Sequence, residues 1–254
     1  MKTPYDELFT DLTRLAASRH ANPNPKGAHN VPVSSRSAPN EARSRESGSG
    51  EPDLVGALLQ ALDEKYALSR KLGQEPGLKD ILSQLVGRLY AAYPDLAAVK
   101  GKRILDIACG SSTSKAPSFV FVNTPLALRP FGVGERRIPI PSKDGYTAQF
   151  EPWFCRILLE LGADPVGVDR GDLSHETFEH YPVDLGQPGA LDFLPEHSFD
   201  AVQDSRLFGS PEFTAQFPRQ ADRLGVAAEI WRQELRLLKP DGIVIHSDAA
   251  QLIQ

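Results

Sequence analysis

The hydrophobic positions of the chain divide it into three regions. In residues 1–19, apolar side chains recur at helical spacing, which predicts one short amphipathic helix from about Tyr5 to Arg19. Residues 20–52 contain no Leu, Ile, Phe, Trp or Tyr and are rich in Pro, Ser, Asn and Gly. Such a segment cannot bury enough apolar area to offset its chain entropy, so we predict a flexible linker. Residues 53–254 carry the core.

Helical spacing continues where the third region begins. Residues 53–100 form a predicted helical cap with two helices, from Leu54 to about Leu72 and from Leu78 to Leu96. Each has a single apolar stripe, which is explained by packing against a core. Nothing in these stripes requires a ligand.

After Gly101 the pattern changes to short apolar runs that alternate with amphipathic helices. Strands are predicted at residues 103–107, 165–169, about 181–184, 199–203 and 243–246, and helices at 151–161 and 221–238. Gly162 is placed to end the first helix, and residues 239–242 have turn chemistry. This alternation predicts an α/β fold. We expect a Rossmann-like, doubly wound, mostly parallel sheet of about five or more strands, with helices on both faces and N-terminal helices before it.

The composition narrows the class of protein. Of 254 residues, 41% are hydrophobic and 24% are charged, which excludes wholesale disorder and a fibrous structure. No apolar run is long enough to span a membrane, and the N-terminus has no signal pattern, so we expect a cytoplasmic protein. A net charge of −5 argues against nucleic-acid and membrane partners. Two cysteines and scattered histidines give no metal-ligand spacing, so no metal site is expected.

The candidate chemistry lies where the predicted strands end. In an open parallel sheet, ligands bind beyond the carboxyl ends of the strands. There the chain places a turn of small residues, 108–112, in which backbone N–H groups can approach a ligand closely. The other strand ends carry Asp169, Asp184 and the pair Asp204-Ser205. Together these groups predict a pocket for a nucleoside with a polar tail.

The same segments resemble a known family, the class I S-adenosylmethionine-dependent methyltransferases. The segment 105–110 (Leu-Asp-Ile-Ala-Cys-Gly) is similar to the family's first motif, and 161–169 is similar to its second strand with the ribose-binding acid. Three further segments follow in the family's order: 183–185, 194–202 and 237–242. The resemblance covers residues 101–248, and the order of the pieces is more specific than any one of them.

This resemblance implies S-adenosylmethionine as the cofactor and assigns roles to individual residues. Asp106 would hold the turn near the methionine amino group. Three turn residues would line the amino-acid and ribose portions, namely Ala108, Cys109 and Gly110. Asp204 and Ser205 would lie closest to the sulfonium and the substrate.

On the nucleoside side, the resemblance gives Asp169 the ribose hydroxyls and places Arg170 beside the adenine. Asp184 would accept from the adenine amino group, and Leu185 would supply a backbone contact. We therefore expect Gly110 and Asp169 to face each other across a hollow large enough for an adenosine.

The chain departs from the family at three places. The family's three glycines stand here as Ala108, Gly110 and Ser112, so one is kept. An insert at about 111–149 separates the turn from the second strand; it could be a lid over the site or a surface ornament, and we favour the lid. The family usually continues past the fifth strand, whereas this chain ends at Gln254. The edge of that strand would need a cover, from the insert, from another segment or from a second subunit in a homodimer, unless the edge is short and blunted.

The function expected from the sequence is methyl transfer to a small-molecule acceptor. Alignment and exclusion of water can accelerate such a displacement, so no catalytic residue can be named. Cys109 and Cys155 are interpreted as packing residues and His246 as a core histidine, with a pocket-facing His246 as the alternative. Two other functions stay open. One is a non-catalytic S-adenosylmethionine-binding or scaffold protein; the other is a nicotinamide-dependent oxidoreductase, although the turn lacks the Gly-x-Gly-x-x-Gly spacing.

Overall fold

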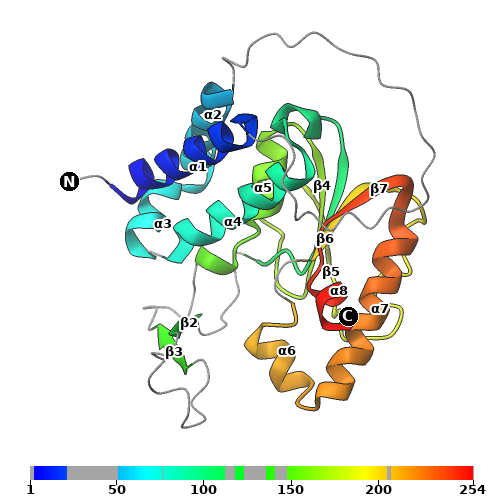
Figure 1. The fold of residues 1–254 in the computed structure, drawn as a ribbon. Coiled ribbons are helices and arrows are strands. Elements are labelled where there is room, and N and C mark those ends of the chain that lie inside the picture. Colours follow the sequence, from blue (N-terminus) through cyan, green and yellow to red (C-terminus); the bar gives the residue numbers. More distant parts are fainter. Residues whose placement is uncertain are drawn as a thin grey trace.

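The structure is a computed structural model that describes residues 3–21, 51–75, 77–111, 118–122, 136–140, 148–204 and 207–253 (Figure 1). Its centre is a sheet of five parallel strands in the order β5-β4-β1-β6-β7. The bounds are β1 Arg103–Ile107, β4 Asp164–Asp169, β5 Glu179–Pro182, β6 Phe199–Asp204 and β7 Leu238–His246. The predicted α/β class with a parallel sheet is confirmed, and the arrangement is consistent with a Rossmann-like fold.

Helices cover both faces of the sheet (Figure 1). On one face, α4 (Gly77–Ala92) and α5 (Trp153–Glu160) pack on β1 and β6 through a core that includes Ile104 and Ala201. The helices α1 (Pro4–Ala21), α2 (Glu51–Tyr66) and α3 (Leu68–Gln74) extend this core outward. On the other face, α7 (Gln220–Leu237) packs against alternate strand residues such as Leu105 and Val202. The period of two along the strands thus divides the core into two layers.

The N-terminal helices differ from the prediction at two points. The helix expected over 54–72 is broken at Ala67, whose φ of 54° is left-handed, so α2 ends and α3 begins there. The helix expected to reach Leu96 ends at Ala92, because Pro94 disfavours helical backbone in the residue before it. A short 3-10 helix, η1 (Leu96–Val99), follows, and the Asp95 side chain accepts from the Ala97 N–H at 2.9 Å.

The later elements largely follow the prediction, and Gly162 ends α5 with a φ of 79°. The third strand, expected at 181–184, lies two residues earlier as β5. The predicted turn at 239–242 belongs to β7, which pairs with β6 through two register shifts. Two short helices were not predicted, α6 (Pro211–Gln216) and α8 (Asp248–Ile253).

Of the insert, the structure describes two strands and the exit. The predicted apolar runs form β2 (Ser118–Val122) and β3 (Arg136–Ile140), an antiparallel pair separate from the main sheet. The exit is a 3-10 helix, η3 (Ala148–Phe150). The predicted turn at 143–145 and most of the predicted linker, 22–50, lie outside the described residues; α1 and α2 extend into the ends of that linker.

Among the described strands, β7 pairs only with β6, so no described strand covers its outer edge. The register shifts between β6 and β7 are irregularities of the kind that blunt an edge. A homodimer that covers this edge stays a prediction. No helix in the described part of the chain combines the length and the apolar content needed to cross a bilayer.

Candidate functional site

The turn after β1 and the acid after β4 are in direct contact. Because β1 pairs with β4, their carboxyl ends lie together, and the Gly110 N–H donates to Asp169 Oδ2 at 2.9 Å. The Gly171 N–H donates to Asp169 Oδ1 at 2.8 Å. The expected hollow between Gly110 and Asp169 is therefore wrong, since a hydrogen bond joins them. A ligand at this site must lie beside the pair.

The Asp169 carboxylate keeps the ability to accept further hydrogen bonds. Its side chain is partly exposed, and a carboxylate offers about four acceptor positions. Burial raises the pKa of Asp169, while the N–H groups of Gly171, Gly110 and Arg170 act in the opposite direction. Two hydroxyl groups of a ribose could use the positions that the backbone leaves.

The backbone conformation and the packing at position 110 require glycine, whether or not a ligand binds there. Its φ of 90° is left-handed, and a Cβ there would collide with the Phe150 carbonyl oxygen, which accepts from the Ser111 N–H at 2.8 Å. Ala108, at the place of the family's first glycine, has a φ of 60°, a conformation that costs a non-glycine residue about 1 kcal/mol. The exit of the insert therefore rests directly on the turn.

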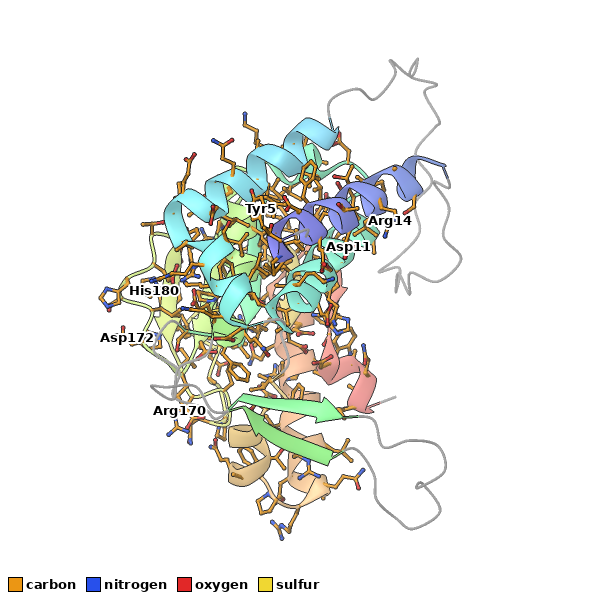
Figure 2. All side chains as sticks on the ribbon, turned by 90° about the vertical axis from the view of Figure 1, so that its left-hand side faces the viewer. Tyr5, Asp11, Arg14, Arg170, Asp172 and His180 are labelled. Carbon is orange, nitrogen blue, oxygen red and sulfur yellow. The ribbon has the colours of Figure 1, made fainter. Side chains whose placement is uncertain are left out.

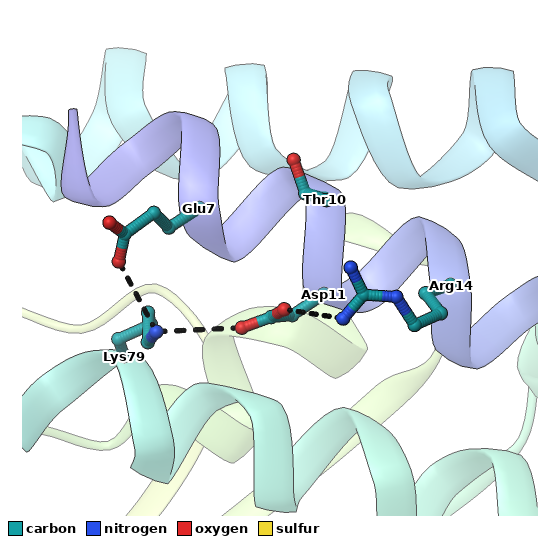
Figure 3. A pocket seen from close by; sticks show the side chains of 5 residues that line it. All are labelled: Glu7, Thr10, Asp11, Arg14 and Lys79. Atoms are coloured by element: carbon teal, nitrogen blue, oxygen red, sulfur yellow. Dashed lines mark hydrogen bonds and ion pairs between the residues drawn. The ribbon is translucent and has the colours of Figure 1, made fainter. Parts of the chain in front are cut away.

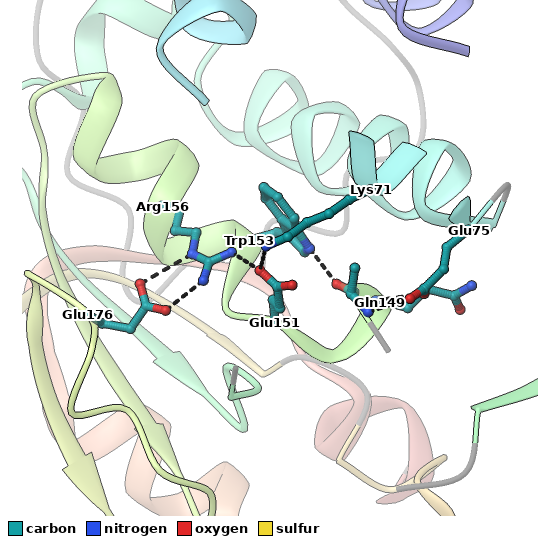
Figure 4. A network of polar contacts seen from close by, with 8 residues as sticks. Lys71, Glu75, Gln149, Glu151, Trp153, Arg156 and Glu176 are labelled. Carbon is teal, nitrogen blue, oxygen red and sulfur yellow. Dashed lines mark hydrogen bonds and ion pairs between the residues drawn. The ribbon is translucent and has the colours of Figure 1, made fainter. Parts of the chain in front are cut away.

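A buried ionic network holds that exit in place (Figure 4). Glu151 pairs with Lys71 of α3, at 2.6 Å, and with Arg156 of α5. Arg156 also pairs with Glu176 at 2.7 Å, and its guanidinium lies over the rings of Tyr66 and Trp153. These contacts join the exit of the insert to the helical cap and to α5.

Hydrogen bonds to the backbone complete this attachment. Glu75, after α3, accepts the Ala148 N–H at 2.7 Å, and Trp153 Nε1 donates to the Ala148 carbonyl at 2.6 Å (Figure 4). The pattern of hydrophobic positions does not predict this network. Its one local signal is the pair Glu151 and Arg156, two charges at the start of a helix whose inner face is otherwise apolar.

Three buried side chains belong to this region: Asp106 of β1, Cys109 of the turn and Cys155 of α5. Asp106 is fully buried, and Cys155 Sγ lies 3.8 Å from its Oδ2. Cys109 and Cys155 are buried free thiols; burial raises the pKa of Cys109 well above its ordinary value and that of Cys155 to about 11. Both therefore stay protonated near neutral pH, as packing residues do.

The predicted nucleoside side is brought together at the ends of β4 and β5. The Val183 N–H donates to the Asp169 carbonyl at 2.8 Å, which brings Asp184 next to this strand end. Asp184 is partly buried and accepts the Gly186 N–H at 3.0 Å, Leu185 is buried, and Arg170 is exposed. Gly171 was missed by the sequence analysis; besides its bond to Asp169, it leaves no room for a Cβ against Ser111 Oγ.

Asp204 has a different role from the one expected. It is fully buried at the end of β6, where its carboxylate accepts from Ser247 Oγ at 2.8 Å and from the N–H groups of Asp248 and Ala249 at 2.6 and 2.9 Å. These bonds cap the N-terminus of α8, so the expected contact of Asp204 with a sulfonium or substrate is wrong for this conformation. Ser205 lies outside the described residues.

A second buried carboxyl lies opposite Asp204. Glu234 of α7 is fully buried, and neither of its oxygens has a hydrogen-bond partner among the described residues. Burial, followed by the charge of Asp204, raises the pKa of Glu234 well above its ordinary value. Burial therefore favours the neutral form of this carboxyl.

The N-terminal helices carry a separate polar depression (Figure 3). It is lined by Glu7, Thr10, Asp11, Arg14 and Lys79. The charges in it pair with one another: Lys79 lies 3.3 Å from Glu7 and 3.5 Å from Asp11. Figure 2 places Asp11 and Arg14 on α1, away from Arg170 at the end of β4, so we do not connect this depression with the turn.

The described residues contain no group of three or more His, Cys, Asp or Glu side chains that could hold a metal ion. Comparisons of the chain with protein-family models, with curated proteins and with solved structures find no match. The candidate site therefore rests on its own geometry.

Proposed function

We propose that this protein binds S-adenosylmethionine and transfers the methyl group to a small-molecule acceptor. The observation that carries the proposal is the contact between Gly110 and Asp169 beside the point where the strand order reverses, between β1 and β6. Ligands of open parallel sheets bind at such a reversal. The resemblance of residues 101–248 to the methyltransferase family supports the same ligand.

The residues present fit the nucleoside half of this cofactor. Asp169 is partly exposed and has acceptor positions left for the ribose hydroxyls, and Asp184 lies at the next strand end to accept from the adenine amino group. The turn 108–110 and Asp106 would hold the amino-acid portion, and Arg170 would lie beside the adenine. When bound, the cofactor supplies a methyl group activated by a sulfonium.

The chain's own contribution is orientation and exclusion of water. The insert leaves the domain at Ser111 and returns at Phe150, next to the turn. The network around Glu151 fixes this return, so the insert is anchored beside the proposed site, as a lid would be.

A second candidate is a protein that binds the same ligand without methyl transfer, or a scaffold. Two observations favour it, because each leaves a residue of the expected site less available to a ligand. Asp204 accepts hydrogen bonds from the first residues of α8, and the Phe150 carbonyl lies against Gly110.

Calorimetric titration of the full chain with S-adenosylhomocysteine tests the proposal. We expect binding that weakens about tenfold or more in Asp169→Ala, because the ribose hydroxyls lose a charged acceptor. Asp172→Ala, an exposed acid three residues along the same loop, is the matched control and should bind like the wild type (Figure 2).

Parallel titrations separate the alternatives. Binding of NAD in place of S-adenosylhomocysteine would support an oxidoreductase, and binding of neither would support a scaffold. If S-adenosylhomocysteine binds, a mass-spectrometric screen for methylated acceptors distinguishes an enzyme from a binding protein.

A further inference from the structure

Two free thiols lie together at the turn after β1. Cys109 belongs to the turn and Cys155 to α5, and both are buried in one cluster with Leu173 and Phe178. The chain has two cysteines in all, so this pair contains every thiol of the protein. The proposed function gives the pair no role beyond packing.

Gly167 of β4 shows how close the two sulfur atoms are. A Cβ at this position would lie 2.9 Å from Cys109 Sγ and 3.4 Å from Cys155 Sγ, so both sulfurs border the space that a side chain at 167 would fill. The two thiols also interact with each other. The fold therefore presents one sulfur to the other at a place where β4 has no side chain.

Cys109 connects this pair to the candidate site. Its N–H donates to the Val168 carbonyl at 3.1 Å, and the next N–H along the chain, that of Gly110, donates to Asp169 at 2.9 Å. Cys109 Sγ lies 3.4 Å from the Gly110 carbonyl oxygen. Because Cys109 and Gly110 share a peptide group, a displacement of Cys109 moves the N–H that Asp169 accepts.

We propose that Cys109 and Cys155 form a reversible disulfide when the protein meets hydrogen peroxide, and that this bond changes the turn at Gly110. The sulfur atoms of a disulfide are about 2.05 Å apart, much closer than two thiols in contact, so the bond draws Cys109 toward α5. The Gly110 N–H then moves relative to Asp169. Formation of the disulfide does not depend on the proposed function, whereas its effect on S-adenosylmethionine binding rests on that function.

The oxidation proceeds in two steps. Cys109 is 5% exposed and Cys155 is 0% exposed, so the peroxide meets Cys109 first. The Cys109 sulfur attacks a peroxide oxygen, the O–O bond breaks, and a sulfenic acid and one water form. The Cys155 sulfur then attacks the Cys109 sulfur; the S–S bond forms, the S–O bond breaks, and a second water leaves with the Cys155 proton. Two thiols are oxidised and one peroxide is reduced to two waters.

The surroundings of the thiols determine how fast they react. Burial raises the pKa of both thiols, and the nearby carboxylates of Asp106, Asp169 and Glu176 act in the same direction. Because the thiolate is the reactive form, oxidation should be slow at pH 7 and should accelerate about tenfold per pH unit toward alkaline pH. The Cys155 thiol donates to Asp106 Oδ2 at 3.8 Å, so an acceptor lies beside the proton that it must lose.

The experiment treats the full folded chain with hydrogen peroxide at pH 7 and pH 8, followed by thiol counting and peptide mapping by mass spectrometry. We expect two free thiols before treatment and none after it, with one linked pair of peptides that contains Cys109 and Cys155. Dithiothreitol should restore both thiols. Hydrogen exchange of the Gly110 amide, followed by nuclear magnetic resonance, should become about tenfold or more faster in the oxidised protein, because its bond to Asp169 is weakened.

Two variants separate the disulfide from other effects of peroxide. Cys155→Ser and Cys155→Ala remove the second thiol and leave every residue of the turn in place. In both variants, Gly110 exchange should not respond to peroxide. The affinity for S-adenosylhomocysteine, measured by calorimetry, should fall about tenfold or more when the wild type is oxidised and should stay constant in the two variants.

The possible results lead to different conclusions. Peroxide treatment that leaves Cys109 and Cys155 unlinked in the folded wild type overturns the inference. A disulfide that leaves Gly110 exchange unchanged overturns the effect on the turn. A disulfide that accelerates Gly110 exchange, in a protein without affinity for S-adenosylhomocysteine, supports the inference and overturns the proposed function.

Discussion

Asp169 and Asp204 are the last residues of the two strands that flank β1, but their surroundings and their hydrogen bonds differ. Burial raises the pKa of both carboxyls. Asp169 is partly exposed and keeps acceptor positions, whereas Asp204 is fully buried and accepts from three groups that hold α8. The position of an acid at a strand end thus makes it a neighbour of the site. Exposure and unused acceptor positions decide whether it can bind a ligand.

We expect the largest loss of stability from a substitution of the buried acid, Asp204. Asp204→Ala leaves the N–H groups of Asp248 and Ala249 and the Ser247 hydroxyl without their acceptor, so we expect a loss of about 3–5 kcal/mol in the free energy of unfolding, measured by urea denaturation. Asp241→Ala, at an exposed position of β7, should change stability by less than about 0.5 kcal/mol. A loss below about 1 kcal/mol in Asp204→Ala would refute the structural role of this acid.

The second prediction concerns Gly110, whose N–H donates to Asp169. Gly110→Ala forces a side chain into left-handed backbone and against the Phe150 carbonyl, so we expect it to destabilise the fold by at least about 2 kcal/mol. Gly225→Ala is the matched control: it lies inside α7 with open space around it and should gain roughly 0.5–1 kcal/mol. Equal stability of the two variants would show that the turn is not tightly packed.

Over any one pH unit, the smallest change concerns Glu234, the acid opposite Asp204, because its contribution to stability depends on pH. The raised pKa of Glu234 means that the folded protein keeps a proton which the unfolded chain releases above pH 4.5. Stability should therefore fall with rising pH, by about 1.4 kcal/mol per unit, from pH 4.5 up to the folded pKa. Glu234→Gln should match the wild type near pH 4.5 and should lack this part of the decline. Parallel stability curves for the two proteins would contradict a raised pKa of Glu234.

Much of the fold could be predicted because buried parallel strands are short apolar runs, as at 103–107 and 165–169. The adjacency of β1 and β4 explains why Gly110 and Asp169 lie at one site, as predicted, although the hydrogen bond between them was not expected. The break at Ala67 could not be predicted, since no glycine or proline marks it. The capping role of Asp204 could not be predicted, because the six residues of α8 carry no strong helix signal. In the sequence, Asp204 therefore resembles Asp169, as an acid at the end of a strand. The network of Lys71, Glu151 and Glu176 joins charges far apart in the chain, and each of them alone resembles a surface residue.

The hydrogen bond of 2.8 Å between the Ser111 N–H and the Phe150 carbonyl means that the chain departs from the domain and rejoins it at one point. The length of the chain between Ser111 and Ala148 can therefore change without pulling on β1 or α5. A junction of this kind lets an inserted segment diversify while the sheet beneath it keeps its geometry.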